Sequence, residues 1–214
     1  MTFPNILDHV VLASNSLPDA VSYFEELTGV TPQRGGDHVT GTSNSLVTFT
    51  VNGEPSIHYL EIIGPNPART EKLDNNVFGI NTRTEPGLAG YSVRPESLDD
   101  FSVALKDAGV EPNQIGDLAR ETPEGDLLSW RIISGNHNGA VSPIPFSIDW
   151  GTTPHPSATT KPTVELVSLI ARTPNPEKTR ATLEQLGVDI VVEQADEPSL
   201  ELVIDTPKGR ITLS

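Results

Sequence analysis

Two side chains with the chemistry to bind a metal ion or to move a proton stand out in the sequence, His9 and Glu61. His9 lies in the run 7–12 and Glu61 in the run 58–65, and both runs are rich in apolar and β-branched residues. Residues of these types favour strands. We therefore expect two strands, each carrying one group that can serve as a metal ligand or an acid-base catalyst.

The alternation of side chains along a strand predicts the neighbours of each group. His9 and Glu61 are expected on apolar faces, shared with Leu7, Val11 and Ala13 and with Tyr59 and Ile63, respectively. An ionised carboxylate on such a face is costly unless it is paired or bound to a metal. A lone histidine also suits a hydrogen-bonded core, and a lone glutamate an exposed sheet edge, so it is the pair that points to a site.

The composition narrows the class of partner. The chain has 214 residues and a formal net charge of -15, with its acidic residues scattered along it. So acidic a protein is not expected to bind nucleic acid or an anionic membrane, because both present phosphate groups. The expected partner is a small-molecule ligand.

Cysteine is absent. This excludes disulfides, zinc sites with thiolate ligands and a cysteine nucleophile, so any metal ion must be held by nitrogen and oxygen. The first residues lack the basic and apolar regions of a signal peptide, and no apolar run approaches the ~18 residues of a membrane span. The sequence therefore predicts a cytoplasmic protein.

Residues 1–65 have the pattern of one structural unit. A strand at 7–13 precedes a helix whose N-cap is Ser16 and which ends at Gly29. A short return begins at 30–32, a strand spans 45–51, and the turn Asn52-Gly53 leads to a last strand at 56–63. The predicted order is strand, helix and three strands, or βαβββ.

The same order recurs twice more. Residues 88–151 contain a strand, a helix capped by Ser97 and three further strands, and a proline-rich joint leads to a third βαβββ-like unit at 162–214. Each predicted helix ends at a Gly-Val pair, at Gly29, Gly109 and Gly187, and the three pairs are almost evenly spaced. The pattern therefore divides the chain into three units.

Each unit has an apolar sheet face that it cannot cover alone. The first two units are expected to pair as a cup-shaped mixed sheet with helices outside and a shared cavity inside, which is an α+β fold. The third unit leaves an open sheet edge. Either packing on the first two units or pairing with its equivalent in a homodimer would cover that edge.

Short motifs along nearly the whole chain carry a family resemblance. They are Leu7-Asp8-His9, Gly36-Asp37-His38, Gly41-Thr42-Ser43-Asn44, Tyr59 to Pro65, Leu128 to Arg131, Pro145 to Gly151, His155-Pro156 and Asp205 to Gly209. The ordered set resembles the vicinal oxygen chelate superfamily, and within it the glyoxalase-like domain group. The resemblance implies a cup of two paired units, in which side chains on the first and last strands of each unit hold a divalent metal ion. Members include isomerases, lyases, extradiol dioxygenases, epimerases and resistance proteins.

By position, His9 matches the first-strand ligand of unit one and Glu61 the last-strand ligand. Unit two departs from the family pattern. When the two units are aligned, Gly90 takes the position of His9 and Ile148 the position of Glu61. Asp149 would reach the cavity only if a β-bulge re-aimed it. Nitrogen and oxygen ligands without a thiolate are compatible with Fe, Mn, Zn, Ni or Co.

Further residues are predicted to complete the site. His38 and His155 lie in turn-rich segments of the kind that supplies ligands and acid-base groups at cavity mouths. We predict His38 as a metal ligand beside His9 and Glu61, and as an acid-base group together with Glu61. Substrate contacts are predicted for Tyr59, Asn44, Trp130, Trp150 and His155, while structural or solvated roles are predicted for His58, His137 and Arg131.

The sequence thus predicts a divalent-metal-dependent enzyme of lyase, isomerase or dioxygenase type, acting on a small oxygen-rich molecule in the cup. The alternative is a metal-free binding or resistance-type protein that sequesters an apolar or aromatic molecule. Gly90 and Ile148 favour the alternative, because they leave the usual set of ligands half empty.

Overall fold

The computed structural model describes residues 3–71, 73, 76–135 and 139–214. His137, predicted to be structural or solvated, lies outside the described residues. Within them the chain forms three α-helices and a continuous twelve-stranded sheet.

The first unit has the predicted order of elements. It comprises β1 (Leu7–Ala13), α1 (Leu17–Thr28), β2 (Gln33–His38), β3 (Thr42–Val51) and β4 (Glu54–Pro65). Ser16 caps α1 as predicted, its hydroxyl accepting the Asp19 amide hydrogen, and Gly29 ends the helix with a φ of 75°. The return strand lies later than predicted, because β2 begins only at Gln33.

The second unit repeats this order. It comprises β5 (Gly87–Val93), α2 (Leu98–Asp107), β6 (Gly116–Glu121), β7 (Leu127–Ile133) and β8 (Phe146–Asp149). Ser97 caps α2 by accepting the amide hydrogen of Asp100, as its position in the sequence predicts.

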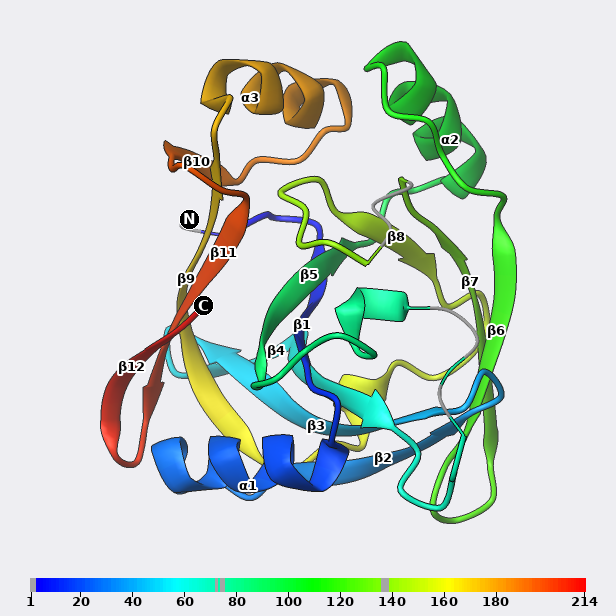
Figure 1. Ribbon diagram of the computed structural model, residues 1–214, viewed down its shortest axis with the longest axis vertical. Coiled ribbons are helices and arrows are strands. Elements are labelled where there is room, and N and C mark those ends of the chain that lie inside the picture. The colour runs from blue at the N-terminus through cyan, green and yellow to red at the C-terminus, as the bar shows by residue number, and fades with distance from the viewer. Residues whose placement is uncertain (1–2, 72, 74–75, 136–138) are drawn as a thin grey trace.

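The eight strands of these two units close into a barrel (Figure 1). In unit one β1 pairs with β4, β4 with β3 and β3 with β2, and in unit two β5 pairs with β8, β8 with β7 and β7 with β6. Antiparallel pairs β1–β5 and β2–β6 join the units. The expected cup is therefore confirmed, and its two seams meet to form a closed, curved sheet.

The two faces of the barrel differ in what covers them. The outer face carries the largest apolar cluster, in which Val10, Leu12 and Leu60 join Leu17 and Phe24 of α1. The helices lie on the outside of the barrel (Figure 1). The interior is left to a smaller set of side chains, and it is there that His9 and Glu61 point.

The third unit extends the sheet of the first. It comprises β9 (Thr163–Thr173), α3 (Pro176–Gln185), β10 (Val191–Gln194), β11 (Ser199–Thr206) and β12 (Gly209–Leu213). β9 pairs in parallel with β3 at Thr48–Thr50, beyond the residues of β3 that pair with β2. The order of elements matches units one and two, but β10 lies directly beside β9, whereas two strands, β4 and β3, separate β2 from β1.

The segment between the first two units enters the barrel. Its short 3-10 helix η1 (Val77–Gly79) lies within the ring of strands in Figure 1. Phe78 in this helix has a φ of 53°, a left-handed conformation that costs energy for a bulky residue. A second 3-10 helix, η2 (Pro156–Ala158), precedes β9.

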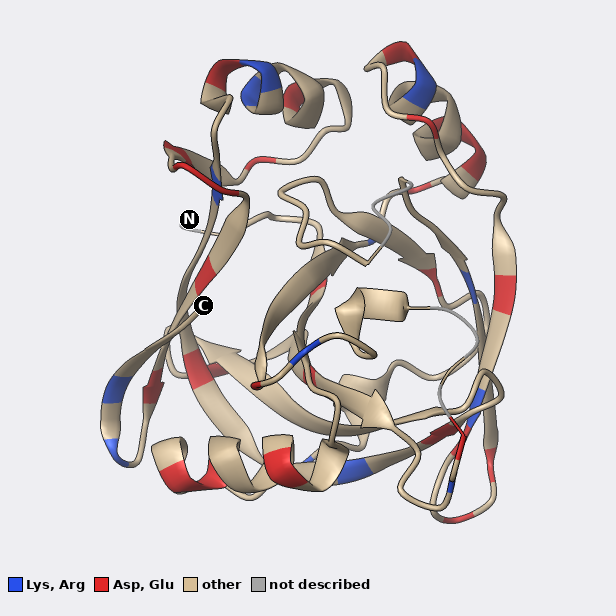
Figure 2. Ribbon diagram, in the orientation of Figure 1, with Lys and Arg blue, Asp and Glu red and all other residues tan. Residues whose placement is uncertain are grey.

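Acidic side chains are spread over all three helices and over several strands and loops (Figure 2). This distribution agrees with the scattered acidic residues of the sequence. Of the helices in the described part of the chain, none has the length and apolar content needed to cross a membrane.

Candidate functional site

His9 and Glu61 meet inside the barrel because their strands are neighbours. β1 and β4 run parallel, with His9 opposite Tyr59 and Val11 opposite Glu61. Both side chains line an interior cavity of about 180 Å³. The sequence-based expectation that two distant strands bring an imidazole and a carboxylate together is met by this geometry.

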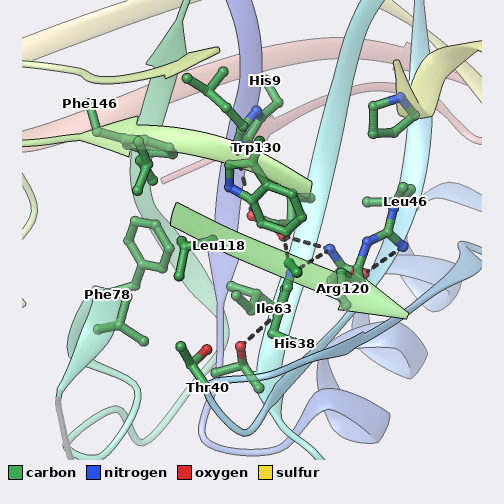
Figure 3. Close-up of a pocket in the computed structure, with 18 of the residues that line it drawn as sticks. His9, His38, Thr40, Leu46, Ile63, Phe78, Leu118, Arg120, Trp130 and Phe146 are labelled. Atoms are coloured by element: carbon green, nitrogen blue, oxygen red, sulfur yellow. Dashed lines mark hydrogen bonds and ion pairs between the residues drawn. The ribbon is translucent and has the colours of Figure 1, made fainter. Parts of the chain in front are cut away.

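Glu61 is the polar centre of the cavity (Figure 3). Asn44 Nδ2 donates a hydrogen bond of 2.6 Å to Glu61 Oε1. His9 Nε2 lies 3.7 Å from Glu61 Oε2, and His38 Nε2 lies 3.8 Å from Glu61 Oε1. The carboxylate is only 8% exposed, so these three side chains supply most of its polar surroundings.

A buried carboxylate behind His9 fixes the orientation of the ring. His9 Nδ1 donates to Asp8 Oδ1 at 2.6 Å. Because the ionised carboxylate can only accept, the proton of a neutral His9 must be on Nδ1. The lone pair on Nε2 then points toward Glu61.

Asp8 is the first of two residues of this site that sequence reasoning did not single out. It is fully buried, and its Oδ2 accepts hydrogen bonds from His155 Nε2 at 3.1 Å and Trp150 Nε1 at 3.2 Å. Arg94 Nε lies 3.2 Å from the same oxygen, without the alignment of a hydrogen bond. Burial alone would raise the pKa of Asp8, but the hydrogen bonds from His155 and His9 outweigh it and hold the pKa well below its ordinary value.

A β-bulge explains why Asp8 was overlooked. The register between β1 and β5 shifts between Leu7 and His9, so strict alternation fails at this point. Leu7, predicted to share the face of His9, instead packs in the outer apolar cluster with Val10 and Leu12. Val11 and Ala13 lie with Ile63 in the inner cluster, as predicted.

His38 reaches the cavity from the last position of β2 instead of from a turn. Its Nδ1 lies 2.7 Å from Thr42 Oγ1, and the amide of Asn44 lies 3.4 Å from its Nε2. Asn44 donates through Nδ2, so Nε2 is the accepting nitrogen of His38 and Nδ1 carries the proton. Burial lowers the pKa of His38, with the nearby Glu61 acting in the opposite sense, so the ring is neutral at neutral pH.

Arg120 is a second residue that the sequence did not single out. It lies on β6, is 3% exposed and lines the cavity, and its Nη1 donates to Asn44 Oδ1 at 3.3 Å. Gly35 makes room for it, because a Cβ at that position would stand 2.5 Å from Arg120 Nη1 and 2.2 Å from Asn44 Oδ1. The Gly35-Gly36 pair was the sequence signal for this close approach.

Aromatic side chains form much of the remaining wall. Trp130 and Trp150 line the cavity with ring centroids 5.1 Å apart, and Tyr59 stacks on His9 at 4.7 Å. Burial raises the pKa of Tyr59 well above its ordinary value, and the negative charges of Asp8 and Glu61 act in the same direction. Tyr59 is therefore a neutral wall residue at any moderate pH.

The predicted substrate-contact residues separate into two groups. Asn44, Tyr59, Trp130 and Trp150 line the cavity, whereas His155 is not among the lining residues. The His155 ring binds Asp8 through Nε2, and its Nδ1 faces Ser157. This placement gives His155 a role behind His9 and does not support the predicted contact with substrate.

Unit two supplies wall residues of the cavity but neither of the two metal ligands that the family pattern would place on its first and last strands. Ile148 lines the cavity, and Asp149, which accepts a hydrogen bond from the Gly151 amide, does not. A Cβ at Gly90 would be 3.6 Å from the ring of Phe78, so η1 fills the space that a longer side chain would need. The register of β7 and β8 is regular at Asp149, so no bulge turns it inward.

Of the three residues predicted to be structural or solvated, the two that the structure describes have surroundings consistent with those roles. His58 Nδ1 donates to the Leu7 carbonyl at 2.7 Å, and its ring lies edge-on to Phe3. Arg131 is partly exposed and lies 3.8 Å from Asp99 across the surface. Neither side chain lines the cavity.

The donor set has the chemistry of a metal site but not the finished geometry. Two imidazole Nε2 lone pairs face one carboxylate, and an acceptor behind the ring fixes the first imidazole, a relation typical of metal-binding histidines. With metal–ligand distances of about 2.0–2.2 Å, two ligands of one ion lie at most roughly 4.3 Å apart, so the separations from Glu61 are within range. Across the described residues, no group of three or more His, Cys, Asp or Glu side chains is arranged to hold an ion as the side chains stand.

A family model described as a glyoxalase-like domain matches residues 7–187. The chain belongs to this family. The match spans units one and two and reaches the end of α3, and it confirms the resemblance to the vicinal oxygen chelate superfamily that the sequence motifs carried. No curated protein matches the chain.

Several solved structures are similar to this glyoxalase-like protein, and the one from Staphylococcus aureus supports its fold. A hypothetical protein from Staphylococcus aureus is 16% identical with a TM-score of 0.63, covering 96% of this chain and 83% of its own. Methylmalonyl-CoA epimerase of Streptomyces coelicolor is 15% identical with a TM-score of 0.44, covering 69% of this chain and 95% of its own. The epimerase of Mycobacterium tuberculosis is 17% identical with a TM-score of 0.44, covering 71% and 91%.

Proposed function

We propose that this glyoxalase-like protein is a divalent-metal-dependent enzyme that moves a proton at a carbon next to an oxygen-bearing group of a small molecule. The observation that carries the proposal is the buried Glu61 carboxylate, which faces the Nε2 atoms of His9 and His38 at 3.7 and 3.8 Å. Burying a carboxylate costs free energy, so its presence in a cavity calls for a reason. A buried carboxylate with two imidazole rings beside it has the composition of a catalytic centre.

Glu61 is the proposed base. Asn44 holds its Oε1, so Oε2 is the oxygen directed at the space beside His9. The carboxylate is largely shielded from solvent, so Oε2 faces the cavity and could take a proton from a substrate bound there. Trp130 and Phe146 form apolar wall around it and exclude water from the reacting carbon.

His9, His38 and Glu61 are the proposed holders of the metal ion. The Asp8 carboxylate keeps the His9 Nε2 lone pair directed inward, and Thr42 holds the His38 ring through Nδ1. Asn44 donates to His38 Nε2 at 3.4 Å, and a metal ion would replace that hydrogen bond. A bound divalent ion would act as a Lewis acid toward neighbouring oxygens of the substrate. The nitrogen and oxygen donors are compatible with Fe, Mn, Zn, Ni or Co.

Calorimetric metal titration and elemental analysis test the metal site. The wild type should bind one divalent ion, and His9→Ala should weaken that affinity by more than about 100-fold, because a ligand is lost outright. His58→Gln is the matched control, since His58 bonds to the Leu7 carbonyl outside the cavity. A wild-type protein with no measurable affinity for any of the five metals would overturn the metal-dependent chemistry.

Isotope exchange tests the proton transfer. Metal-loaded protein in D2O should exchange deuterium into at least one acid of a panel of small 2-hydroxy and 2-oxo acids, at C2 of a hydroxy acid or at C3 of an oxo acid, as followed by proton NMR. Glu61→Gln should abolish that exchange, because an amide is not a base at neutral pH. Exchange that persists unchanged in the Glu61→Gln variant would assign the base elsewhere.

A second candidate function is metal-free binding of an apolar or aromatic small molecule. The observation in its favour is that Glu61 already accepts a short hydrogen bond from Asn44 while the described side chains form no ready cluster of three ligands. Ligand binding in the cavity without any metal affinity would favour this candidate over the enzyme.

A further inference from the structure

Arg120 is a buried cation that has no ionic partner among the residues that the structure describes. Its residue is 3% exposed, and no carboxylate of the described chain lies within the 4.0 Å of an ion pair. Burial lowers the pKa of its guanidinium, with the more distant Glu61 acting in the opposite sense. Buried charges are normally paired, because the desolvation cost of an isolated one is large. A cation kept in the wall of a cavity therefore indicates a charge that arrives with the ligand.

The guanidinium has donors to spare for such a group. It carries five N–H bonds in a planar fork. Within the described residues one of them has a partner, the Nη1 donor that binds Asn44 Oδ1 at 3.3 Å. Because Arg120 lines the cavity, the remaining donors are available to a planar anion, which a guanidinium binds with two parallel hydrogen bonds.

The two ends of the cavity differ in character. In Figure 3 Arg120 and His38 lie at one side, whereas Phe78, Leu118 and Phe146 lie at the other. The cavity of about 180 Å³ is slightly larger than the roughly 150 Å³ cavity that holds benzene. Its shape and polarity therefore suit a ring-sized apolar body with one anionic end.

We infer that Arg120 binds the carboxylate of a small aromatic acid whose ring packs against Phe78 and Phe146. This inference rests on the proposed function, in that the same cavity holds the substrate, and it adds the substrate class. Asn44 bonds both Arg120 and Glu61, so a carboxylate held by Arg120 would bring its neighbouring carbon to the side of the proposed base. The proposed proton transfer needs an acid in which that carbon carries a hydrogen, as in an arylacetic acid.

Tryptophan fluorescence provides a direct test. The chain has two tryptophans, and both line the cavity, so intrinsic emission reports on its occupancy. Benzoate and benzamide are the probes, because they match in size and shape and differ in charge. Wild-type protein should bind benzoate about 10- to 100-fold more tightly than benzamide, as expected for charge-assisted hydrogen bonds.

Two variants separate recognition from mere support of the fold. Arg120→Gln should bind the two probes with equal affinity, and Arg120→Lys should keep part of the preference, because lysine retains the charge but not the fork. If Arg120 only positions Asn44, Arg120→Gln would weaken both probes alike and the wild-type preference would survive. That result, or equal binding of both probes by the wild type, would overturn the inference.

The remaining outcomes distinguish this inference from the proposed function. If metal binds and exchange occurs while benzoate gives no fluorescence change, the substrate class is refuted and the proposed function stands. If neither metal nor probe binds, both are refuted. Circular dichroism of each variant shows that a lost response comes from the cavity and not from an unfolded chain.

Discussion

Replacing Asp8 with alanine should be among the most damaging single changes in this protein. Asp8 is fully buried, and its carboxylate accepts hydrogen bonds from His9, His155 and Trp150. Removing it leaves three donors unpaired, two of them on buried residues and one on the partly buried His155, each worth about 1–3 kcal/mol. The variant also no longer buries a charge, and the histidines can shift their protons, so the net loss should be about 3–5 kcal/mol, as for other broken buried pairs.

Urea denaturation measures this loss. With a slope of about 2 kcal/mol per molar urea, the unfolding midpoint of Asp8→Ala should fall by roughly 1.5–2.5 M. Asp205→Ala is the matched control, because its ion pair with Arg210 is exposed on the β11–β12 hairpin, and its midpoint should not change. A midpoint for Asp8→Ala within about 0.5 M of the wild type would refute the view that Asp8 organises this region.

The Asp8→Ala variant should also change how the stability of the protein depends on pH. The folded-state pKa of Asp8 lies well below the ordinary value of about 3.9, so the folded state stabilises the charged form. Its contribution is therefore fully present above about pH 4 and is lost as the pH falls toward the folded pKa. The wild type should lose stability more steeply than Asp8→Ala between about pH 4 and pH 2. Equal slopes would show that another group governs acid unfolding.

Two further changes test the walls of the cavity. Gly35→Ala should reduce benzoate affinity and lower the free energy of unfolding by about 1–3 kcal/mol, because the added Cβ would lie 2.2 Å from Asn44 Oδ1. Unchanged benzoate binding would show that β2 can shift to make room. Phe78→Ala should let 2-naphthoate bind at least as tightly as benzoate, because Phe78 lines both the site and a neighbouring cavity that also contacts Gly90 and Tyr91. Fluorescence titration checks both, and a variant that still rejects the larger acid would show that another residue divides the two cavities.

The parts of the fold that follow from local patterns were predictable. The strand Leu7–Ala13 and the caps Ser16 and Ser97 were read directly, because strand propensity and capping depend on neighbouring residues. Gly109 and Gly187 have φ values of 76° and 69°, the left-handed geometry that the Gly-Val pattern indicated.

The pairing of the third unit could not be predicted in this way. Its elements follow the same order as those of the first unit, yet β10 pairs directly with β9. Strand order in a sheet depends on contacts between distant segments, here the parallel pairing of β9 with β3, and the order of elements along the chain does not fix it.

The site residues that lie on regular strands could be predicted from the alternation of side chains. Those whose burial depends on contacts with distant segments of the chain were missed. Alternation along regular stretches put His9 and Glu61 inside, but it failed at the bulge that buries Asp8 among Trp150 and His155. Arg120 was missed because a single cation at the end of a strand resembles a solvated charge until the strand packed beside it is known.

The position of Phe78 explains a difference between the two halves of the barrel in how they line the cavity. Two repeated half-barrels would be expected to line their shared cavity alike. In the described part of the chain, however, its imidazoles and its carboxylate come from the first half, and the counterpart of His9 in the second is Gly90, which faces the ring of Phe78. The segment that connects the two halves thus fills the space that a longer side chain at the position of Gly90 would need. The two halves of the barrel are therefore unequal, because the first brings imidazoles and a carboxylate to the shared cavity and the second brings the guanidinium of Arg120.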